Sequence, residues 1–103
     1  MNNIRLSEEQ VKIIKEVIKK VTGCECKTYL FGSRVDIKSK GGDIDLLILL
    51  PEGLSDEKLS QIKFSLLKEF YKNLGERQID LLLVSGEPKK EIEKIALKKG
   101  VIL

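Results

Sequence analysis

The stretch "DIDLLILL", residues 43–50, decides the fold, because it is an apolar run that begins with two aspartates. An apolar run of this length that ends at a proline is typical of a buried β-strand, and Pro51 follows directly. Side chains alternate along a strand, so Asp43 and Asp45 point to the same face. Burying an unpaired carboxylate is costly, which indicates that something positive sits beside this strand.

A second apolar run, "QIDLLLV" at residues 78–84, repeats the pattern and contains Asp80. If the two strands are neighbours in register, Asp80 lies beside Asp43 and Asp45. Three carboxylates held that close repel, and one would stay protonated unless a cation intervened. Carboxylate clusters bind hard divalent cations, Mg²⁺ or Mn²⁺, and two such ions can activate an attacking oxygen and stabilise a leaving pyrophosphate. The alternative is that each aspartate is only a strand-end residue that caps a turn.

Hydrophobic periodicity and turn-forming residues divide the rest of the chain into helices and strands. Ser7 and Gln10 form a capping-box pattern, and Ser55 is suited to cap a second helix. The tail at residues 101–103 either adds a short strand or packs on the core. The expected elements are a helix from Ser7 to Gly23, strands at 26–31, 43–50 and 78–84, a helix from Ser55 to Gly75, and a last helix with Pro88 in its first turn and Gly100 at its end.

The order of these elements favours a mixed sheet. The short connection at residues 34–42 suits an antiparallel pair, and the helix between the second and third strands suits a crossover. We therefore expect an α+β fold, a two-layer arrangement in which a small mixed β-sheet is backed by helices on one side. With 103 residues, the chain has the size of one domain, residues 1–103.

The long helix carries a broad apolar face, which predicts burial against more than one neighbour. The main stripe is Leu59, Ile62, Leu66 and Phe70, widened by Phe64, Leu67 and Tyr71.

Composition excludes several kinds of chemistry. The chain has no histidine, so Ser-His and Cys-His nucleophilic mechanisms are excluded. Cys24 and Cys26 are too close for an easy disulfide and too few for a zinc site, so we expect two reduced cysteines. A net charge of +3 permits an anionic ligand without indicating nucleic acid. Neither a long apolar run nor a signal-peptide pattern is present, so we expect a cytoplasmic protein without a membrane partner.

The pair Gly32-Ser33 ends the first predicted strand, and nine residues separate it from Asp43. A strand that breaks at this pair leaves backbone N–H groups free and lets a ligand approach closely. If a helical turn begins at Ser33, its N-terminus and hydroxyl make a phosphate site.

With these segments the sequence resembles the minimal nucleotidyltransferases (MNT), small members of the DNA polymerase β-like superfamily. The matching stretches are "FGSRV" at 31–35, "GGDIDLLIL" at 41–49 and "RQIDLLLV" at 77–84, and the resemblance covers nearly the whole chain as a bare catalytic core. It implies a mixed sheet backed by helices, and transfer of a nucleoside monophosphate from a nucleoside triphosphate with loss of pyrophosphate.

The resemblance also implies roles for individual residues. Gly32 and Ser33 would hold the β- and γ-phosphates. Asp43 and Asp45 would be metal ligands. Asp80 would complete the site by accepting a metal ion or drawing the proton from the attacking hydroxyl.

The connection between these motifs departs from the family in one respect. The commonest family spacing is one residue longer than the nine residues from Arg34 to Gly42. The flexible pair Gly41-Gly42 can absorb that difference. Arg34, Lys38 and Lys40 are candidates to neutralise the triphosphate, although a solvated loop explains each lysine equally well.

The stand-alone members of the family resemble the antitoxins of HEPN/MNT toxin–antitoxin modules, whose partner is a HEPN-domain ribonuclease toxin. The implied reaction transfers AMP from ATP to a tyrosine hydroxyl of the toxin. An apolar surface beside the aspartates is compatible with a protein partner or with a homo-oligomer, unless the last helix covers it. That surface consists of Leu47, Leu49, Leu82 and Val84.

Other functions stay open from the sequence alone. A non-catalytic binding antitoxin on the same fold is one, although the intact aspartates argue against it. Transfer to a small molecule is another, but it normally needs a second domain. Nucleic-acid polymerisation is less favoured, because aromatic residues make up only 5% of the chain and no template-binding module is visible.

Overall fold

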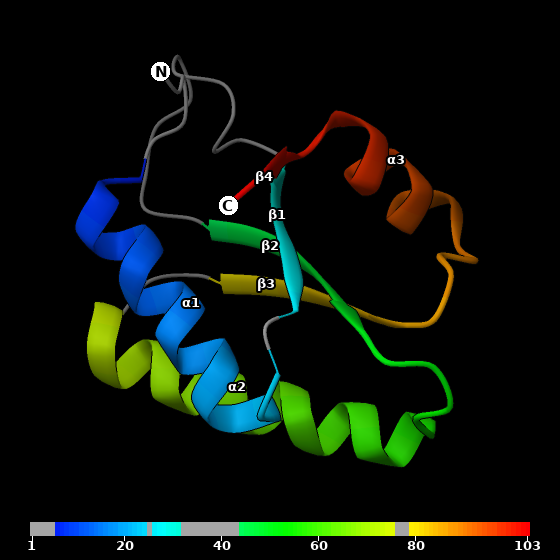
Figure 1. Ribbon diagram of the computed structural model, residues 1–103, viewed down its shortest axis with the longest axis horizontal. Helices are drawn as coiled ribbons and strands as arrows, with labels where there is room; N and C mark the ends of the chain where they lie inside the picture. Colours follow the sequence, from blue (N-terminus) through cyan, green and yellow to red (C-terminus); the bar gives the residue numbers. More distant parts are fainter. Residues whose placement is uncertain (1–5, 25, 32–43, 76–78) are drawn as a thin grey trace.

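The computed structural model describes residues 6–24, 26–31, 44–75 and 79–103. These residues form a four-stranded sheet in the order β3-β2-β1-β4 with helices packed against it (Figure 1). None of the helices in this part of the chain has the length and apolar character needed to cross a membrane. The elements are α1 (Glu8–Thr22), β1 (Lys27–Phe31), β2 (Ile44–Leu50), α2 (Asp56–Leu74), β3 (Ile79–Ser85), α3 (Glu91–Lys99) and β4 (Val101–Ile102).

The sheet is mixed, as the order of elements predicts. β1 and β2 pair antiparallel, whereas β2 and β3 pair parallel. The parallel pair follows from the crossover through α2, which returns the chain to the starting edge of the sheet. The C-terminal tail forms β4, which pairs antiparallel with β1 and ends the sheet with two residues. The predicted α+β fold with a small mixed sheet is therefore confirmed.

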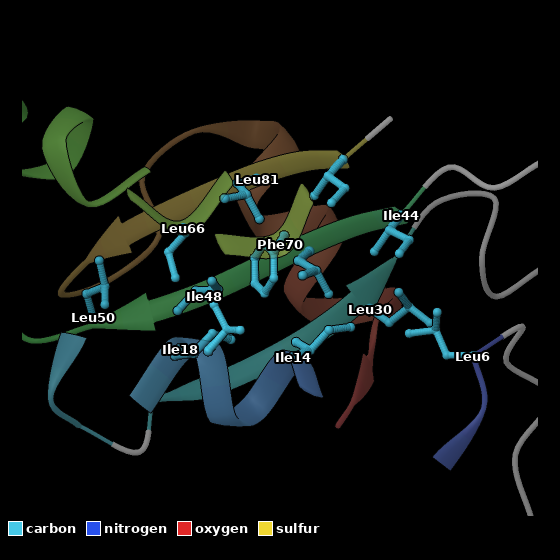
Figure 2. Packing of buried hydrophobic residues seen from close by; sticks show 13 residues of the cluster. Leu6, Ile14, Ile18, Leu30, Ile44, Ile48, Leu50, Leu66, Phe70 and Leu81 are labelled. Atoms are coloured by element: carbon cyan, nitrogen blue, oxygen red, sulfur yellow. The ribbon is translucent and has the colours of Figure 1, made fainter. Parts of the chain in front are cut away.

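The main core lies between one face of the sheet and the pair α1 and α2 (Figure 2). Every second residue of β2 points into it, including Ile44 and Ile48, which are fully buried. Leu66 and Phe70 fill it from α2. The alternation of β2 therefore fixes which face of the sheet the two long helices cover.

Helix α3 packs on the opposite face of the sheet, which the expectation of helices on one side did not include. Leu47, Val84 and Ala96 form a second buried cluster there. The reason lies in β2, which is apolar on both faces, so that its second face also needs a cover. Helix α3 supplies it, and Leu47 becomes fully buried rather than part of an open apolar surface.

The predicted helix ends are mostly confirmed. Ser7 and Gln10 form the capping box of α1, and the Ser55 hydroxyl caps α2. Helix α3 begins later than predicted, at Glu91, so Pro88 lies before the helix rather than in its first turn. The Glu93 carboxylate accepts hydrogen bonds from the backbone N–H groups of Lys89 and Lys90 (3.0 and 3.2 Å), which fixes the start of the helix after the proline.

The apolar face of α2 is narrower than the sequence suggested. Leu66 and Phe70 are fully buried, whereas Phe64 and Tyr71 are 70% and 43% exposed. A helix advances about 100° per residue, so Phe64 and Tyr71 lie about 140–160° around the helix from Leu66 and point away from the core. The prediction that these two aromatic residues are buried is wrong.

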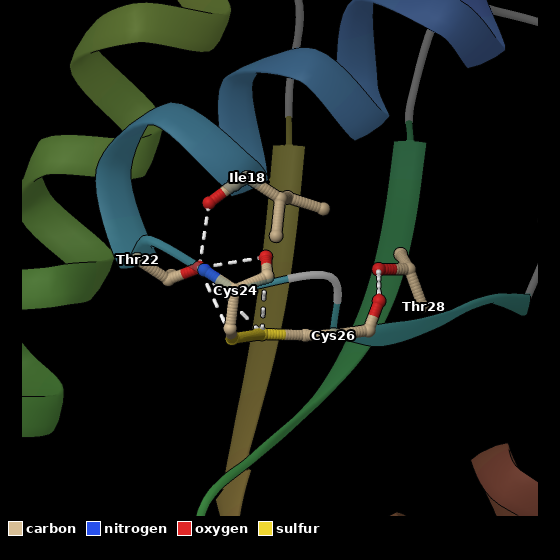
Figure 3. Close-up of a disulfide and its surroundings, with 5 residues drawn as sticks. All are labelled: Ile18, Thr22, Cys24, Cys26 and Thr28. Carbon is tan, nitrogen blue, oxygen red and sulfur yellow. Dashed lines mark hydrogen bonds between the residues drawn. A yellow bond between two sulfur atoms is a disulfide. The ribbon is translucent and has the colours of Figure 1, made fainter.

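The structure joins Cys24 and Cys26 in a disulfide, where the sequence predicted reduced thiols (Figure 3). Gly23 ends α1 with a φ of 77° and turns the chain sharply. The two Cα atoms lie 5.6 Å apart, a separation that suits a disulfide. The Thr22 hydroxyl donates to the Ile18 carbonyl at 2.7 Å beside this bond.

Candidate functional site

Asp45 and Asp80 are direct neighbours on β2 and β3. They are register partners in the parallel pair, so their side chains point to the same face of the sheet. Neighbouring strands lie about 4.8 Å apart, which brings the two carboxylates side by side. Asp45 is half-buried and Asp80 is exposed. The prediction that these two strands are neighbours in register is confirmed.

The register is fixed by buried side chains on the other face. Ile44 precedes Asp45, Ile79 precedes Asp80, and the two isoleucines are themselves partners. Ile44 is fully buried and Ile79 is 6% exposed. A slip of β3 by one residue would turn Ile79 out of the core and Asp80 into it, which strongly disfavours that pairing.

The last residue of β1 lies beside the aspartates. Phe31, the last residue of β1, pairs with Asp45. The described part of β1 therefore ends, and that of β2 begins, at the end of the sheet that carries Asp45 and Asp80. Four of the predicted site residues lie in between, outside the described residues, and their roles stay predictions: Gly32, Ser33, Arg34 and Asp43.

A groove of about 510 Å³ contains both aspartates and continues around the outer edge of β3. Its apolar walls include Phe31, Leu82 and Ile92, and Lys63 adds a cation from α2. No motif marks Lys63 or Ile92, since both lie at ordinary exposed helix positions that only the tertiary structure brings to the groove. The groove is lined by Phe31, Asp45, Lys63, Leu67, Ile79, Asp80, Leu81, Leu82 and Ile92.

A second hollow of about 490 Å³ lies between α1 and the disulfide. Lys12, Lys15 and Lys19 line it, together with both cysteines. Neither Asp45 nor Asp80 is among its lining residues, so this hollow is separate from the carboxylate pair.

The donor set at the groove suits a hard divalent cation. Asp45 and Asp80 bring two carboxylates into register on one face, and carboxylate oxygens are ligands that Mg²⁺ and Mn²⁺ prefer. Within residues 6–24, 26–31, 44–75 and 79–103, no group of three or more potential ligands gathers around one point. Asp43, the third predicted carboxylate, directly precedes the first residue of β2.

Comparison with known protein families settles the family. The model of the family described as "Polymerase beta, Nucleotidyltransferase" matches residues 8–103. The chain belongs to this nucleotidyltransferase family. A search of curated proteins finds no match. Membership supports nucleotidyl transfer as the general reaction of this nucleotidyltransferase. The mixed sheet and the three helices of the described residues are consistent with the polymerase β-like fold.

Proposed function

We propose that this nucleotidyltransferase transfers AMP from ATP to a hydroxyl group of another protein. The acceptor we favour is a tyrosine of a HEPN-domain ribonuclease toxin, for which the chain would act as antitoxin in the cytoplasm. The observation that carries the proposal is the register pairing of Asp45 with Asp80 inside an open groove. An acceptor that belongs to a folded protein needs such an open approach, and the half-exposed Ile92 on the groove wall offers it an apolar contact.

The chemistry assigned to the chain is an in-line displacement at the α-phosphorus. The acceptor oxygen forms the new bond, the bond from the α-phosphorus to the bridging oxygen breaks, and pyrophosphate leaves. Asp80 would take the proton from the attacking hydroxyl. Gly32 and Ser33 would hold the β- and γ-phosphates through backbone N–H groups and the hydroxyl, with Arg34 adding positive charge.

Asp43, Asp45 and Asp80 would hold two Mg²⁺ or Mn²⁺ ions. When bound, these ions supply the positive charge that lets the anionic nucleotide approach a cluster of carboxylates. The same carboxylates without a cation repel each other and the triphosphate, so nucleotide binding by this chain should depend on divalent cations.

The test is a transfer assay with ATP labelled on the α-phosphate and a purified HEPN-domain ribonuclease as acceptor. We expect label on the acceptor with the wild-type chain and Mg²⁺, and none with Asp45→Asn or Asp80→Asn. Asp56→Asn is the matched control, because Asp56 is exposed at the start of α2, away from the groove lining. It should retain transfer.

Two controls separate the alternatives. ATP labelled on the γ-phosphate should leave the acceptor unlabelled, since pyrophosphate carries that label away. Tight association of both wild type and Asp45→Asn with the acceptor, without any label, would replace the proposal with a non-catalytic binding antitoxin. Label on an aminoglycoside-type small molecule instead of the protein would assign a small-molecule acceptor.

A further inference from the structure

The disulfide between Cys24 and Cys26 can be reached from outside the molecule. Both cysteines are half-buried, and both line the hollow of about 490 Å³ beside α1. A disulfide sulfur that borders such a hollow is accessible to a small thiol from solvent. Access of this kind is the first requirement for thiol–disulfide exchange in a folded protein.

The bond constrains little of the fold. Its cysteines are two positions apart in the sequence, where the chain passes from α1 to β1 (Figure 3). A disulfide stabilises a protein mainly by restricting the unfolded chain, and this effect is smallest for short loops. The flanking elements have supports of their own, since the Gly23 N–H donates to the Lys19 carbonyl at 2.8 Å and Thr28 pairs with Ile48 of β2. We therefore expect α1 and β1 to keep their structure when the bond is broken.

Thr22 can satisfy the polar groups of both redox forms. Its hydroxyl donates to the Ile18 carbonyl at 2.7 Å, and its Oγ1 accepts from the Cys24 N–H at 3.2 Å. The same oxygen lies 3.4 Å from the Sγ of Cys24 and 3.6 Å from the Sγ of Cys26. A disulfide sulfur has no proton to donate, whereas a thiol can donate to a hydroxyl oxygen. Reduction therefore produces a thiol with an acceptor already beside it.

The hollow has the size and the charge to hold a small acidic molecule. Its volume lies in the range of small-molecule sites. Three lysines and two glutamates line it, so its wall carries a net positive charge, and two apolar side chains complete the wall on α1. These residues are Lys12, Lys15, Lys19, Glu8, Glu16, Val11 and Ile18. A thiol with a net negative charge is therefore attracted to the place where both sulfur atoms are accessible.

We propose that Cys24 and Cys26 form a reversible thiol–disulfide exchange site, and that the hollow binds the reaction partner, a small thiol with a net negative charge. The thiolate of this partner attacks one sulfur of the bond and forms a mixed disulfide. The other cysteine leaves with the bonding electron pair and takes a proton from water.

A second partner thiolate completes the exchange. It attacks the partner's sulfur in the mixed disulfide and leaves as the partner's disulfide, and the second cysteine is released and protonated. In total, two partner thiols are oxidised to one disulfide while the protein disulfide is reduced to two thiols. The reverse sequence restores the bond. This site stands independently of nucleotidyl transfer, since neither Asp45 nor Asp80 lines the hollow.

The first test counts free thiols in the folded chain, which has two cysteines. We expect none after preparation under oxidising conditions. Two should appear on equilibration with excess reduced glutathione, without denaturant and with an unchanged circular dichroism spectrum, and excess glutathione disulfide should remove them again. Free thiols in the oxidised preparation would overturn the proposal, because the cysteines then do not pair. Thiols that appear only in denaturant would also overturn it, because the bond is then closed to exchange in the folded protein.

The second test asks whether the partner binds in the hollow, by comparing the rates of reduction by glutathione and by cysteamine. The reactive form of glutathione is an anion with additional carboxylates, whereas the ammonium group of cysteamine cancels the charge of its thiolate. Lys15→Gln removes one cation from the wall of the hollow. It should slow glutathione about two- to fivefold, the effect of one unit charge a few ångströms from an anion in water, and leave cysteamine nearly unchanged.

The matched control is Lys98→Gln, because Lys98 is exposed on α3, across the sheet from α1, and does not line the hollow. It should leave both rates unchanged. The effect of Lys15→Gln on glutathione should also shrink in about 1 M NaCl, where the Debye length is about 3 Å. Wild-type rates for both thiols in Lys15→Gln, or the same loss for both, would overturn binding in the hollow.

Discussion

Replacing Asp80 by asparagine should stabilise the protein in the absence of divalent cations. Asp45 and Asp80 are register neighbours on one face, and neighbouring strands lie about 5 Å apart. Two negative charges at that distance repel by about 0.8 kcal/mol in a water-like dielectric. Asparagine keeps the shape of the side chain and removes one charge. We therefore expect the free energy of unfolding to rise by about 0.5–1 kcal/mol, or a few degrees in Tm for a chain of this size.

The assay is urea unfolding followed by circular dichroism at neutral pH, low salt and with a chelator. The stabilisation should nearly vanish in about 1 M NaCl, where the Debye length is about 3 Å. Asp56→Asn should have the opposite sign, because Asp56 lies in the first turn of α2, where a negative charge favours the helix by about 0.3–1 kcal/mol. The repulsion between these carboxylates would be refuted if Asp80→Asn were less stable than wild type. It would also be refuted if the gain in unfolding free energy were the same at low and high salt.

Adding Mg²⁺ should make the wild-type protein more stable than Asp80→Asn, the reverse of their order without the cation. A cation that binds only the folded state stabilises it by about 1.4 kcal/mol when its free concentration is about ten times Kd. Wild type should gain this increment, and Asp80→Asn should gain much less because one ligand is lost. Equal gains in both proteins would mean that Mg²⁺ binds elsewhere.

Two further outcomes test the core and the disulfide. Phe70→Ala should lower the free energy of unfolding by about 3–5 kcal/mol, since Phe70 is fully buried. Phe64→Ala, at a position 70% exposed on the same helix, should change it by less than about 0.5 kcal/mol, and equal effects in urea unfolding would contradict the assigned faces of α2. Reducing the bond between Cys24 and Cys26, which closes a loop of three residues, should cost only about 1.5 kcal/mol, measured as the difference in unfolding free energy with and without reductant.

The sequence predicted the carboxylate pair because two independent local signals agree. Alternation along "DIDLLILL" and "QIDLLLV" puts each aspartate on a defined face, and the intervening helix makes a parallel pair the natural connection. Capping at Ser7 and Ser55 was predictable for the same reason, since a cap depends only on residues within one turn. Signals of this kind need no knowledge of the tertiary structure.

Features that depend on distant neighbours could not be predicted in the same way. Periodicity locates the apolar stripe of α2 but not its width, which α1 and the sheet determine, so Phe64 and Tyr71 were misplaced. The position of Lys63 in the groove depends on how α2 lies against β3, and no motif marks it. The start of α3 depends on the Glu93 carboxylate, which binds the backbone N–H groups of Lys89 and Lys90, whereas Pro88 alone predicts an earlier start.

On one face of β2, burial by α3 ends within two residues, and the groove lies where the burial ends. Leu47 is fully buried under α3, whereas Asp45, two positions earlier, is half-buried in the groove. The cover by α3 therefore ends between them, and Asp45 lines the groove instead. Burial of Ile44 and Ile79 on the opposite face compensates for the local repulsion between the aspartates, since a one-residue shift of β3 that separated them would expose Ile79. The hydrophobic core on one face thus holds a charged pair in place on the other.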